Sequence, residues 1–491
     1  MKKQFFIILL VLSVFFACKI LVEPEIEDDP QDFPVYEGGD MQFIENEFIR
    51  VGIDLNVGGA ITYVAEKSNN INMINNYDWG RQVQMSFFAG PVPYEEDGKK
   101  PSEHWAHIGW NPIQAGDAYH NGSNVISYEN KGNELYVSCI PMQWPLDNVP
   151  GECVYQSWIT LEGYVVKVRA KMSNARSDQT QYQARDNELP AVYTNGSWYR
   201  LVTYTGTQPY TNDDIIEIPI KEKGSGIFPW SRFTATENWA ALLDESGHGL
   251  AVWNDGAAHF LGGFAGVPGT GGTKDNPTGY LTPIHKEVLD HNIEYEYNYQ
   301  LIIGNVKSIR NYIYTHTKGV QEIFEFSKDR QHWMYVNAHD QGWPINNGLT
   351  IEMENPGARV ISPEGCWNTA TYQMVKITAA FSGDQTTSAL GWETFNEEQG
   401  VVNFEVIPDG VVREYVVPLG SAANYTGSVK RWAILLPDGI DNNQTMTLQK
   451  IEIVKASRSL GSSPVGRRRL RVNPCLVETK KHFSLESLNK G

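Results

Sequence analysis

The chain has 491 residues, a formal net charge of −18 at pH 7 and an aromatic content of 12%. This length accommodates two or three ordinary domains, and the composition is that of a folded protein rather than a disordered one. The negative charge argues against nucleic acid as a partner, because phosphates require a basic surface.

The N-terminus has the pattern of an export signal. Two lysines precede the apolar run Phe5–Phe16, and Ala17 stands before Cys18. The run is too short to span a bilayer comfortably as a permanent helix. It resembles a bacterial lipobox, which implies cleavage before Cys18 and lipidation of its thiol. We therefore expect a lipoprotein signal peptide over residues 1–18, the alternative being a plain secreted protein in which Cys18 has no special role.

The segment 19–40 is predicted to be a solvated linker, because it is acidic and punctuated by prolines between Glu23 and Asp32. Its acidic run resembles the surface-export signals of Bacteroidota lipoproteins. That resemblance implies a protein anchored by lipid in the outer membrane and exposed at the surface, where a polysaccharide or oligosaccharide is the expected partner.

The body of the chain is predicted to be all-β. Apolar and polar residues alternate over 166–172 and again over 295–303, as expected for strands with one buried face. Sustained helical periodicity is scarce, with 308–317 the best short helix candidate. We expect a large β-sandwich domain over 41–326 and a smaller one over 327–455.

The basic tail, residues 456–491, is predicted to be poorly ordered, and no function is assigned to it.

The first large domain resembles the β-supersandwich of the galactose-mutarotase-like group. The resemblance rests on the strand Gly58–Val64, the turn Tyr77–Arg81 and the strand Tyr295–Gly304. It implies a relation to sugar epimerases, parts of glycoside hydrolases and polysaccharide lyases, and non-catalytic modules. The histidines and late glutamate of the epimerases have no identifiable counterpart, so the resemblance does not imply mutarotase activity.

The second domain is similar to the galactose-binding-like jelly rolls found in carbohydrate-active proteins. Its cues are the segments Val375–Phe381, Ala389–Trp392, Pro408–Gly410 and Asn424–Gly427. The resemblance implies an accessory carbohydrate-binding-like module, although such modules can also be purely structural.

The densest polar motif is Asn75–Gln84. With a strand period of two, Gln82 and Gln84 share a face opposite Arg81. An arginine and two amides can bind sugar hydroxyls or a uronate carboxylate. Alternatively, Asp78 and Arg81 form a local turn bridge and the amides face water.

The loop around His104, His107 and Trp110 offers a second candidate site. A tryptophan face suits sugar stacking, and a histidine can transfer a proton near neutral pH. Metal ligation by the two histidines is a weaker alternative, since the surrounding Gly and Pro indicate a loop. Ordinary loop packing is the third.

Glu188 is the best acidic candidate, because it stands between polar residues and an apolar run, where partial burial would raise its pKa. We expect it to act as a general acid, with Asp78 or Asp117 as the alternatives for a second carboxylate. Tyr193, Trp198 and Arg200 follow closely and are predicted to line the same site. The alternative for Glu188 is a surface salt bridge.

Other polar residues are interpreted as structural. Structural roles are expected for the scattered residues His259, His285, Glu287 and His291. A disulfide is one alternative for Cys139 and Cys153, which flank a predicted hairpin. No metal or cofactor is predicted, apart from Ca²⁺ as an open option in the second domain.

Taken together, these features predict a surface lipoprotein that acts on extracellular polysaccharide as a glycoside hydrolase or polysaccharide lyase. The alternative is a non-catalytic glycan-binding lipoprotein.

Overall fold

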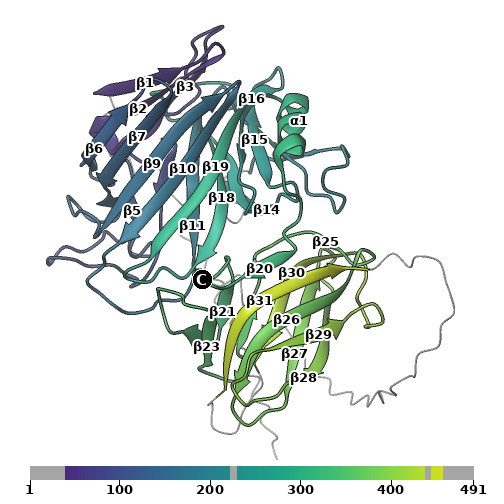
Figure 1. The fold of residues 1–491 in the computed structure, drawn as a ribbon. Helices are drawn as coiled ribbons and strands as arrows, with labels where there is room; N and C mark the ends of the chain where they lie inside the picture. Colours follow the sequence, from purple (N-terminus) through teal and green to yellow (C-terminus); the bar gives the residue numbers. More distant parts are fainter. Residues whose placement is uncertain (1–38, 222–228, 437–443, 457–491) are drawn as a thin grey trace, which may run out of the picture.

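The computed structural model describes residues 39–221, 229–436 and 444–456. In these ranges the chain is nearly all strand, and the strands form two successive β units (Figure 1). The predicted all-β class, a larger sandwich followed by a smaller one, is therefore confirmed. The signal peptide with Cys18, almost all of the predicted linker and almost all of the basic tail lie outside the described residues.

The first unit runs from β1 to α1 and is built on two facing sheets. The back sheet has the strand order β13 (Ile216–Ile218), β12 (Arg200–Thr203), β15 (Trp239–Leu243), β16 (His248–Trp253), β19 (Glu294–Asn305), β10 (Val165–Asn174), β9 (Cys153–Glu162), β7 (Glu134–Ile140), β6 (Asn124–Asn130). The front sheet has the order β14 (Trp230–Thr234), β17 (His259–Ala265), β18 (Thr278–Glu287), β11 (Arg185–Asn195), β4 (Gln84–Ser86), β5 (Pro112–Ile113), β8 (Met142–Gln143). A small sheet at the N-terminal edge contains β1 (Met41–Glu45), β2 (Ile49–Asp54) and β3 (Ala60–Glu66), with the 3₁₀ turn η1 (Leu55–Val57) between the last two.

The core of the first unit lies between the front and back sheets. On β19 the side chains of Tyr295, Tyr297 and Tyr299 point inward and are buried, whereas the residues between them face out. Phe87, which follows β4 of the front sheet, meets Tyr295 and Tyr155 with ring centroids 5.7 and 5.4 Å apart. The alternation read from the sequence over 166–172 and 295–303 thus belongs to β10 and β19.

The helix α1 (Val306–His316) covers the outer side of the back sheet. Asn305 caps it by accepting a hydrogen bond from the Ser308 backbone N–H at 3.0 Å. Arg310 then reaches buried Glu237, with 3.0 Å between Nε and Oε2. No helix in the described ranges is both long and apolar enough to cross a membrane.

The second unit runs from β20 to β31 and is a sandwich with its own core. One sheet has the order β22 (Ala338–Asp340), β23 (Leu349–Met353), β31 (Thr445–Lys455), β26 (Tyr372–Ser382), β29 (Arg413–Pro418), with β20 (Ile323–Glu325) also beside β31. The other has the order β21 (Met334–Val336), β24 (Arg359–Ile361), β30 (Ser428–Leu435), β27 (Thr387–Thr394), β28 (Gln399–Glu405), with β25 (Trp367–Asn368) also beside β30. Buried tryptophans such as Trp392 and Trp432 fill the space between these sheets.

A buried arginine joins the two units. Arg330, from the second unit, lies 2.7 Å from Asp290 and donates to the Val288 carbonyl, both in the first unit. It also pairs with Asp340 of β22 at 2.6 Å. Because all three charged side chains are almost fully excluded from water, this contact fixes how the units meet.

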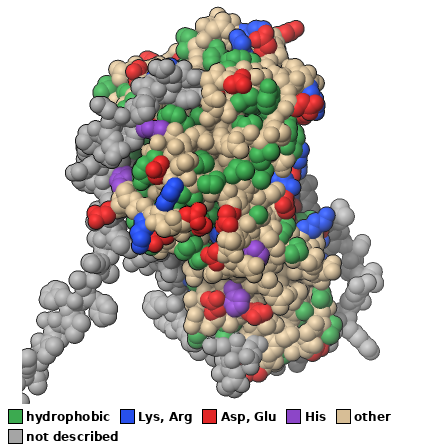
Figure 2. Space-filling model, turned by 90° about the vertical axis from the view of Figure 1, so that its left-hand side faces the viewer, with side chains coloured by type: hydrophobic (Ala, Val, Ile, Leu, Met, Phe, Trp, Pro, Cys, Tyr) green, Lys and Arg blue, Asp and Glu red, His purple; other side chains and the backbone are tan. Residues whose placement is uncertain are grey.

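Surface charge is dispersed. Figure 2 shows acidic side chains scattered among neutral ones over one face of the molecule rather than gathered in a single patch.

Candidate functional site

The front sheet has one face against the core and one open face. Cross-strand partners share a face, so the pairs Asp186–Lys286 and Glu188–Ile284 of β11 and β18 lie on the same side. Tyr280 and Ile284 form the buried floor of the open face. The other residues of this face are half-buried or exposed: Asp186, Glu188, Tyr193, Trp230, Arg232, Thr234, His259 and Lys286.

A β-bulge brings Glu188 and Tyr193 onto this same face. Residues five apart on a regular strand point to opposite sides, but the register of β11 against β18 shifts between Glu188 and Val192. Pro190, which cannot donate a ladder hydrogen bond, lies within the bulge. Tyr193 therefore pairs with Tyr280, and their rings lie 4.6 Å apart.

Glu188 is the predicted general acid, and it lies half-buried on the open face opposite Ser86. Burial raises the pKa of its carboxyl, while the Tyr280 and Ser86 hydroxyls and the Arg232 charge act in the opposite direction. The Tyr280 hydroxyl affects this pKa but forms no hydrogen bond of normal geometry. A carboxyl that keeps its proton to higher pH suits general-acid chemistry.

Asp78, the predicted second carboxylate, is occupied within its own turn. Its Oδ2 lies 3.0 Å from Arg81 Nε, and its Oδ1 accepts the Gly80 N–H at 2.8 Å. Arg81 also donates to the carbonyl and side-chain oxygens of Asn276. The charges of Asp78 and Arg81 act on the pKa of Tyr193, so this turn lies beside the open face.

The expected strand at 80–84 is a bend, and strand β4 begins only at Gln84. Gln82 and Gln84 are buried and do not face water. Gln82 donates to the Asp78 carbonyl at 2.5 Å and Gln84 to the Gly80 carbonyl at 2.8 Å. The bend leaves its carbonyls without sheet partners, and these amides satisfy them.

The loop around His104 packs mostly on itself. His104 lies against Trp105 at 4.2 Å, and Arg185 donates to the carbonyls of His107 and Ile108. Trp110 is fully buried, so its rings offer no face to a ligand.

Trp198 and Arg200 lie apart from Glu188 in the topology. Trp198 is buried, and Arg200 begins β12 of the back sheet, where it pairs with Glu217 at 2.8 Å. Of the predicted residues, the structure therefore brings together Glu188 and Tyr193, with the Asp78–Arg81 turn alongside.

Charged residues that the sequence analysis missed lie at the end of the open face nearest the second unit. Arg232 binds Asp186 at 2.6 Å, and Thr234 donates to Glu364 of the second unit at 2.6 Å. Glu364 also pairs with Arg431.

Lys286 is the unusual cation of this face. It is half-buried, and its ammonium forms no ion pair with any residue that the structure describes. Burial lowers its pKa; the Asp186 charge opposes this, whereas Arg431 and Arg232 add to it. An amine that loses its proton more easily than usual can serve as a general base.

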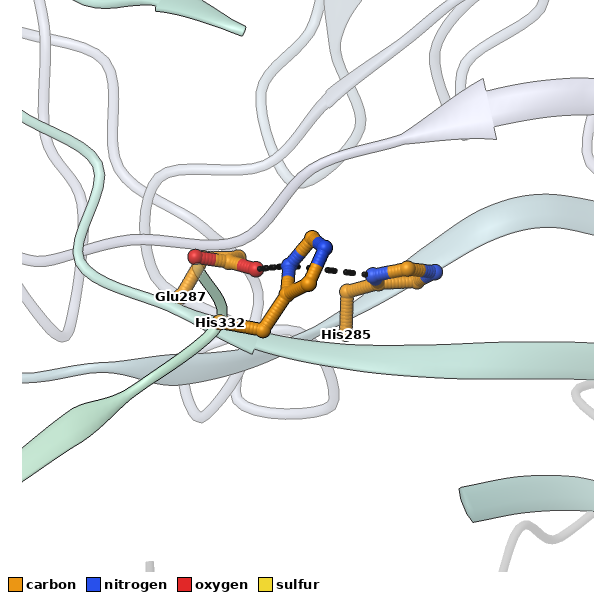
Figure 3. Close-up of side chains that lie close together, drawn as sticks. All are labelled: His285, Glu287 and His332. Atoms are coloured by element: carbon orange, nitrogen blue, oxygen red, sulfur yellow. Dashed lines mark hydrogen bonds and ion pairs between the residues drawn. The ribbon is translucent and has the colours of Figure 1, made fainter. Parts of the chain in front are cut away.

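The opposite face of β18 carries the candidate metal ligands. The ligand atoms of His285, Glu287 and His332 all lie within 4.8 Å of one another (Figure 3). His285 and Glu287 come from β18, and His332 comes from the segment before β21. The interpretation of His285 and Glu287 as scattered is therefore wrong, since strand alternation places both on one side and the fold adds His332.

Two further details concern cysteines and cavities. Cys139, Cys153 and Cys366 are buried free thiols, so the alternative of a Cys139–Cys153 disulfide is not realised. A surface pocket of about 450 Å³ beside α1, lined in part by Tyr164 and His248, contains none of the predicted site residues.

Comparison with known proteins yields structural likeness only. No family model and no curated protein matches the chain. It is similar to a solved galactose mutarotase-like protein from Lactobacillus casei, at 12% identity over 54% of this chain and 99% of the other, with a TM-score of 0.33. It is also similar to an aldose 1-epimerase described as putative from Escherichia coli, at 11% identity over 54% and 98%, with a TM-score of 0.35. An α-galactosidase from Lactobacillus brevis matches at 10% identity over 54% and 39%, with a TM-score of 0.32. At these identities and TM-scores, none of these activities transfers to this chain.

Proposed function

We propose that the protein binds an extracellular polysaccharide at the open face and cleaves it there. One observation carries the proposal: a half-buried carboxyl with a raised pKa, Glu188, shares an exposed sheet face with Lys286, whose pKa is lowered. Oppositely shifted acids and bases on one accessible surface are typical of catalytic sites. Trp230 and Tyr193 offer aromatic surface for sugar rings on the same face.

Of the two predicted reactions, the geometry favours elimination over hydrolysis. Hydrolysis needs a second carboxylate, and on the described open face the nearest one in the strand, Asp186, is paired with Arg232. Elimination needs a base instead, and Lys286 has no ion-pair partner among the described residues.

The reaction would proceed on a uronate unit. The neutral Lys286 amine removes the proton from carbon 5, the bond between carbon 4 and the linking oxygen breaks, and its electrons leave with that oxygen. The electrons of the broken carbon–hydrogen bond form a double bond between carbons 4 and 5. Glu188 donates its proton to the leaving oxygen, and Arg232, an exposed cation of the same face that pairs with Asp186, would bind the sugar carboxylate.

A non-catalytic glycan-binding protein is the second candidate. The Trp230 and Tyr280 rings lie 4.7 Å apart and are tilted by 51°, and such an aromatic surface would serve binding without any acid or base. In both cases we propose that Cys18 carries the lipid that holds the protein at the outer membrane. We also propose that the second unit is an accessory carbohydrate-binding-like domain, whose boundary lies before β20 rather than between the predicted residues 326 and 327, because β20 pairs with β31.

The test is incubation of residues 19–491, the chain without its signal peptide and lipid-bearing cysteine, with a panel of neutral and acidic polysaccharides. Elimination yields unsaturated uronate, detected by its ultraviolet absorbance, whereas hydrolysis yields reducing ends without that absorbance. Saturable binding with neither product would establish the binding protein and refute the enzyme. Replacement of Cys18 by Ser, followed by membrane fractionation, tests the anchor.

A further inference from the structure

We propose that the protein holds a divalent transition-metal ion between its two units, bound by His285, Glu287, Tyr295 and His332. This inference is independent of the proposed carbohydrate chemistry, because the four side chains lie on the core side of β18 rather than on the open face.

The donor atoms of these four residues lie close enough together to surround one ion. The Nδ1 atom of His332 lies 2.5 Å from Glu287 Oε1 and 3.5 Å from His285 Nδ1. The Tyr295 hydroxyl lies 3.0 Å from Glu287 Oε1 and 3.5 Å from each of the two Nδ1 atoms. A tetrahedral ion with ligands at about 2.0–2.1 Å separates them by about 3.3 Å. The 3.0 and 3.5 Å distances lie close to that value, whereas the 2.5 Å hydrogen bond between His332 and Glu287 would lengthen when the ion replaces its proton.

Without a metal ion, the hydrogen bonds within this cluster are poorly satisfied. The side-chain nitrogen of Asn254 lies 2.8 Å from His285 Nε2, and its oxygen already accepts the Gly256 N–H. Nε2 therefore accepts and Nδ1 carries the proton. His332 Nδ1 donates to Glu287, so the His285 N–H faces another N–H at 3.5 Å and has only the long 3.5 Å contact with the Tyr295 oxygen as an acceptor. A bound cation would replace both protons and remove this conflict.

Metal binding by His285 has a consequence for Asn254. With Nδ1 on the metal, Nε2 carries the proton and needs an acceptor, so the Asn254 amide would turn its oxygen toward the ring.

Burial indicates a structural ion rather than an exposed one. His285, Glu287 and Tyr295 are 4%, 5% and 8% exposed. The fourth ligand, His332, keeps 31% of its side chain exposed, which leaves a path for the ion to enter. Two imidazoles, a carboxylate and a phenol suit Zn²⁺ or a related transition ion better than Ca²⁺, which prefers oxygen ligands only.

The ion would join the two units. Three ligands belong to the first unit, whereas His332 follows Arg330, the residue that already bridges to Asp290. Gln331 and His332 both have left-handed backbone angles, with φ of 51° and 62°, an uncommon conformation for these residues that aims His332 at β18.

The experiment compares the chelator-treated full mature chain with its His332→Ala variant. For the wild type we expect one Zn²⁺ bound per chain in calorimetry and a higher Tm with Zn²⁺ than with EDTA. We expect His332→Ala to lose at least about 100-fold in affinity and to lose the Tm difference. His316→Ala, which removes an exposed histidine on α1, should behave as wild type.

A spectroscopic measurement distinguishes the loss of a metal ligand from misfolding of the variant. Wild-type protein loaded with Co²⁺ should show the intense visible bands of a tetrahedral site, and Tyr295→Phe should alter them while circular dichroism stays unchanged. Absence of Zn²⁺ binding by the folded wild type, equal binding by His332→Ala, or weak octahedral Co²⁺ bands would each overturn the proposal.

Discussion

The two faces of β18 carry polar side chains of similar kind in opposite surroundings. On the open face Lys286 is half-buried without an ion-pair partner among the described residues, and it shares that face with Glu188. On the core face His285 and Glu287 are buried and contact His332. Our two proposals thus assign neighbours in sequence to chemistry on one side of the strand and to cohesion of the units on the other. Substitutions that leave the strand intact can separate these two roles.

The largest effect is expected from Glu188→Gln, which removes the proton donor of the open face. Turnover should fall about 10²–10⁴-fold, because general-acid catalysis contributes that much. Binding of the polysaccharide and the Tm should change little, since the amide keeps the shape of the side chain. Glu296→Gln, on the outer side of the back sheet, is the matched control and should keep full activity. Equal turnover in both variants would remove Glu188 from the mechanism.

Substitutions on the core side of β18 and at the junction of the units should lower the free energy of unfolding rather than the turnover. Arg330→Met leaves Asp290 and Asp340 as buried carboxylates without their cation, at a cost of about 3–5 kcal/mol in the free energy of unfolding. Chemical denaturation measures this. Arg413→Met breaks only the exposed pair with Asp409 and should have a far smaller effect. If both substitutions cost the same, the buried junction does not hold the units together.

Acid should weaken the contact between the open face and the second unit. Burial alone would raise the pKa of Glu364, but His259, Arg431 and Lys430 outweigh it and hold that pKa far below its usual 4.5. A folded-state pKa that is lowered contributes stability above pH 4.5, and this contribution is lost as the pH falls from 4.5 toward the folded-state pKa. We expect unfolding free energies measured below pH 4.5 to fall less steeply for Glu364→Gln than for the wild type; parallel curves would contradict this.

The pH dependence of turnover should be bell-shaped. The active form has a protonated Glu188 and a neutral Lys286, so one proton is shared between the two groups. The rate should therefore rise through the raised pKa of Glu188, fall through the lowered pKa of Lys286, and peak between them. In Lys286→Met any residual activity depends on protonated Glu188 alone, so it should be highest at acid pH and fall through the pKa of that group. An unchanged bell-shaped profile would count against Lys286 as the base.

The smallest effect is expected from Trp230→Ala. Loss of one stacking ring should weaken oligosaccharide binding by about 0.5–1.5 kcal/mol, measured by calorimetry. The buried Trp333 of the second unit, by contrast, should affect stability rather than binding when replaced by Phe. A binding loss from Trp333→Phe as large as that from Trp230→Ala would show that the open face is not where the sugar rests.

Periodicity in the sequence predicted what depends on one strand or helix at a time. The alternation over 295–303 and the helical pattern over 308–317 correspond to β19 and α1. The position of Glu188 between polar and apolar residues predicted its raised pKa, because partial burial follows from that context.

Contacts between distant segments could not be predicted in this way. His332 stands 47 residues from His285 in sequence, and nothing local in either segment indicates that they meet. Glu188 and Tyr193 share a face only because of the bulge at Pro190, which strict alternation does not foresee. Lys286 was missed because the charges that act on its pKa, those of Asp186, Arg232 and Arg431, come from β11, β14 and the second unit.

The most direct test of the central claim measures unsaturated uronate released from an acidic polysaccharide by three proteins: wild type, Lys286→Met and Lys171→Met. Lys171 is a half-buried lysine of β10 on the back sheet and pairs with Glu294 at 2.5 Å. We predict product from the wild type and Lys171→Met, and a loss of at least about 100-fold in Lys286→Met. Undiminished product from Lys286→Met, or none from the wild type on any acidic polysaccharide, would contradict the assignment of catalysis to the open face.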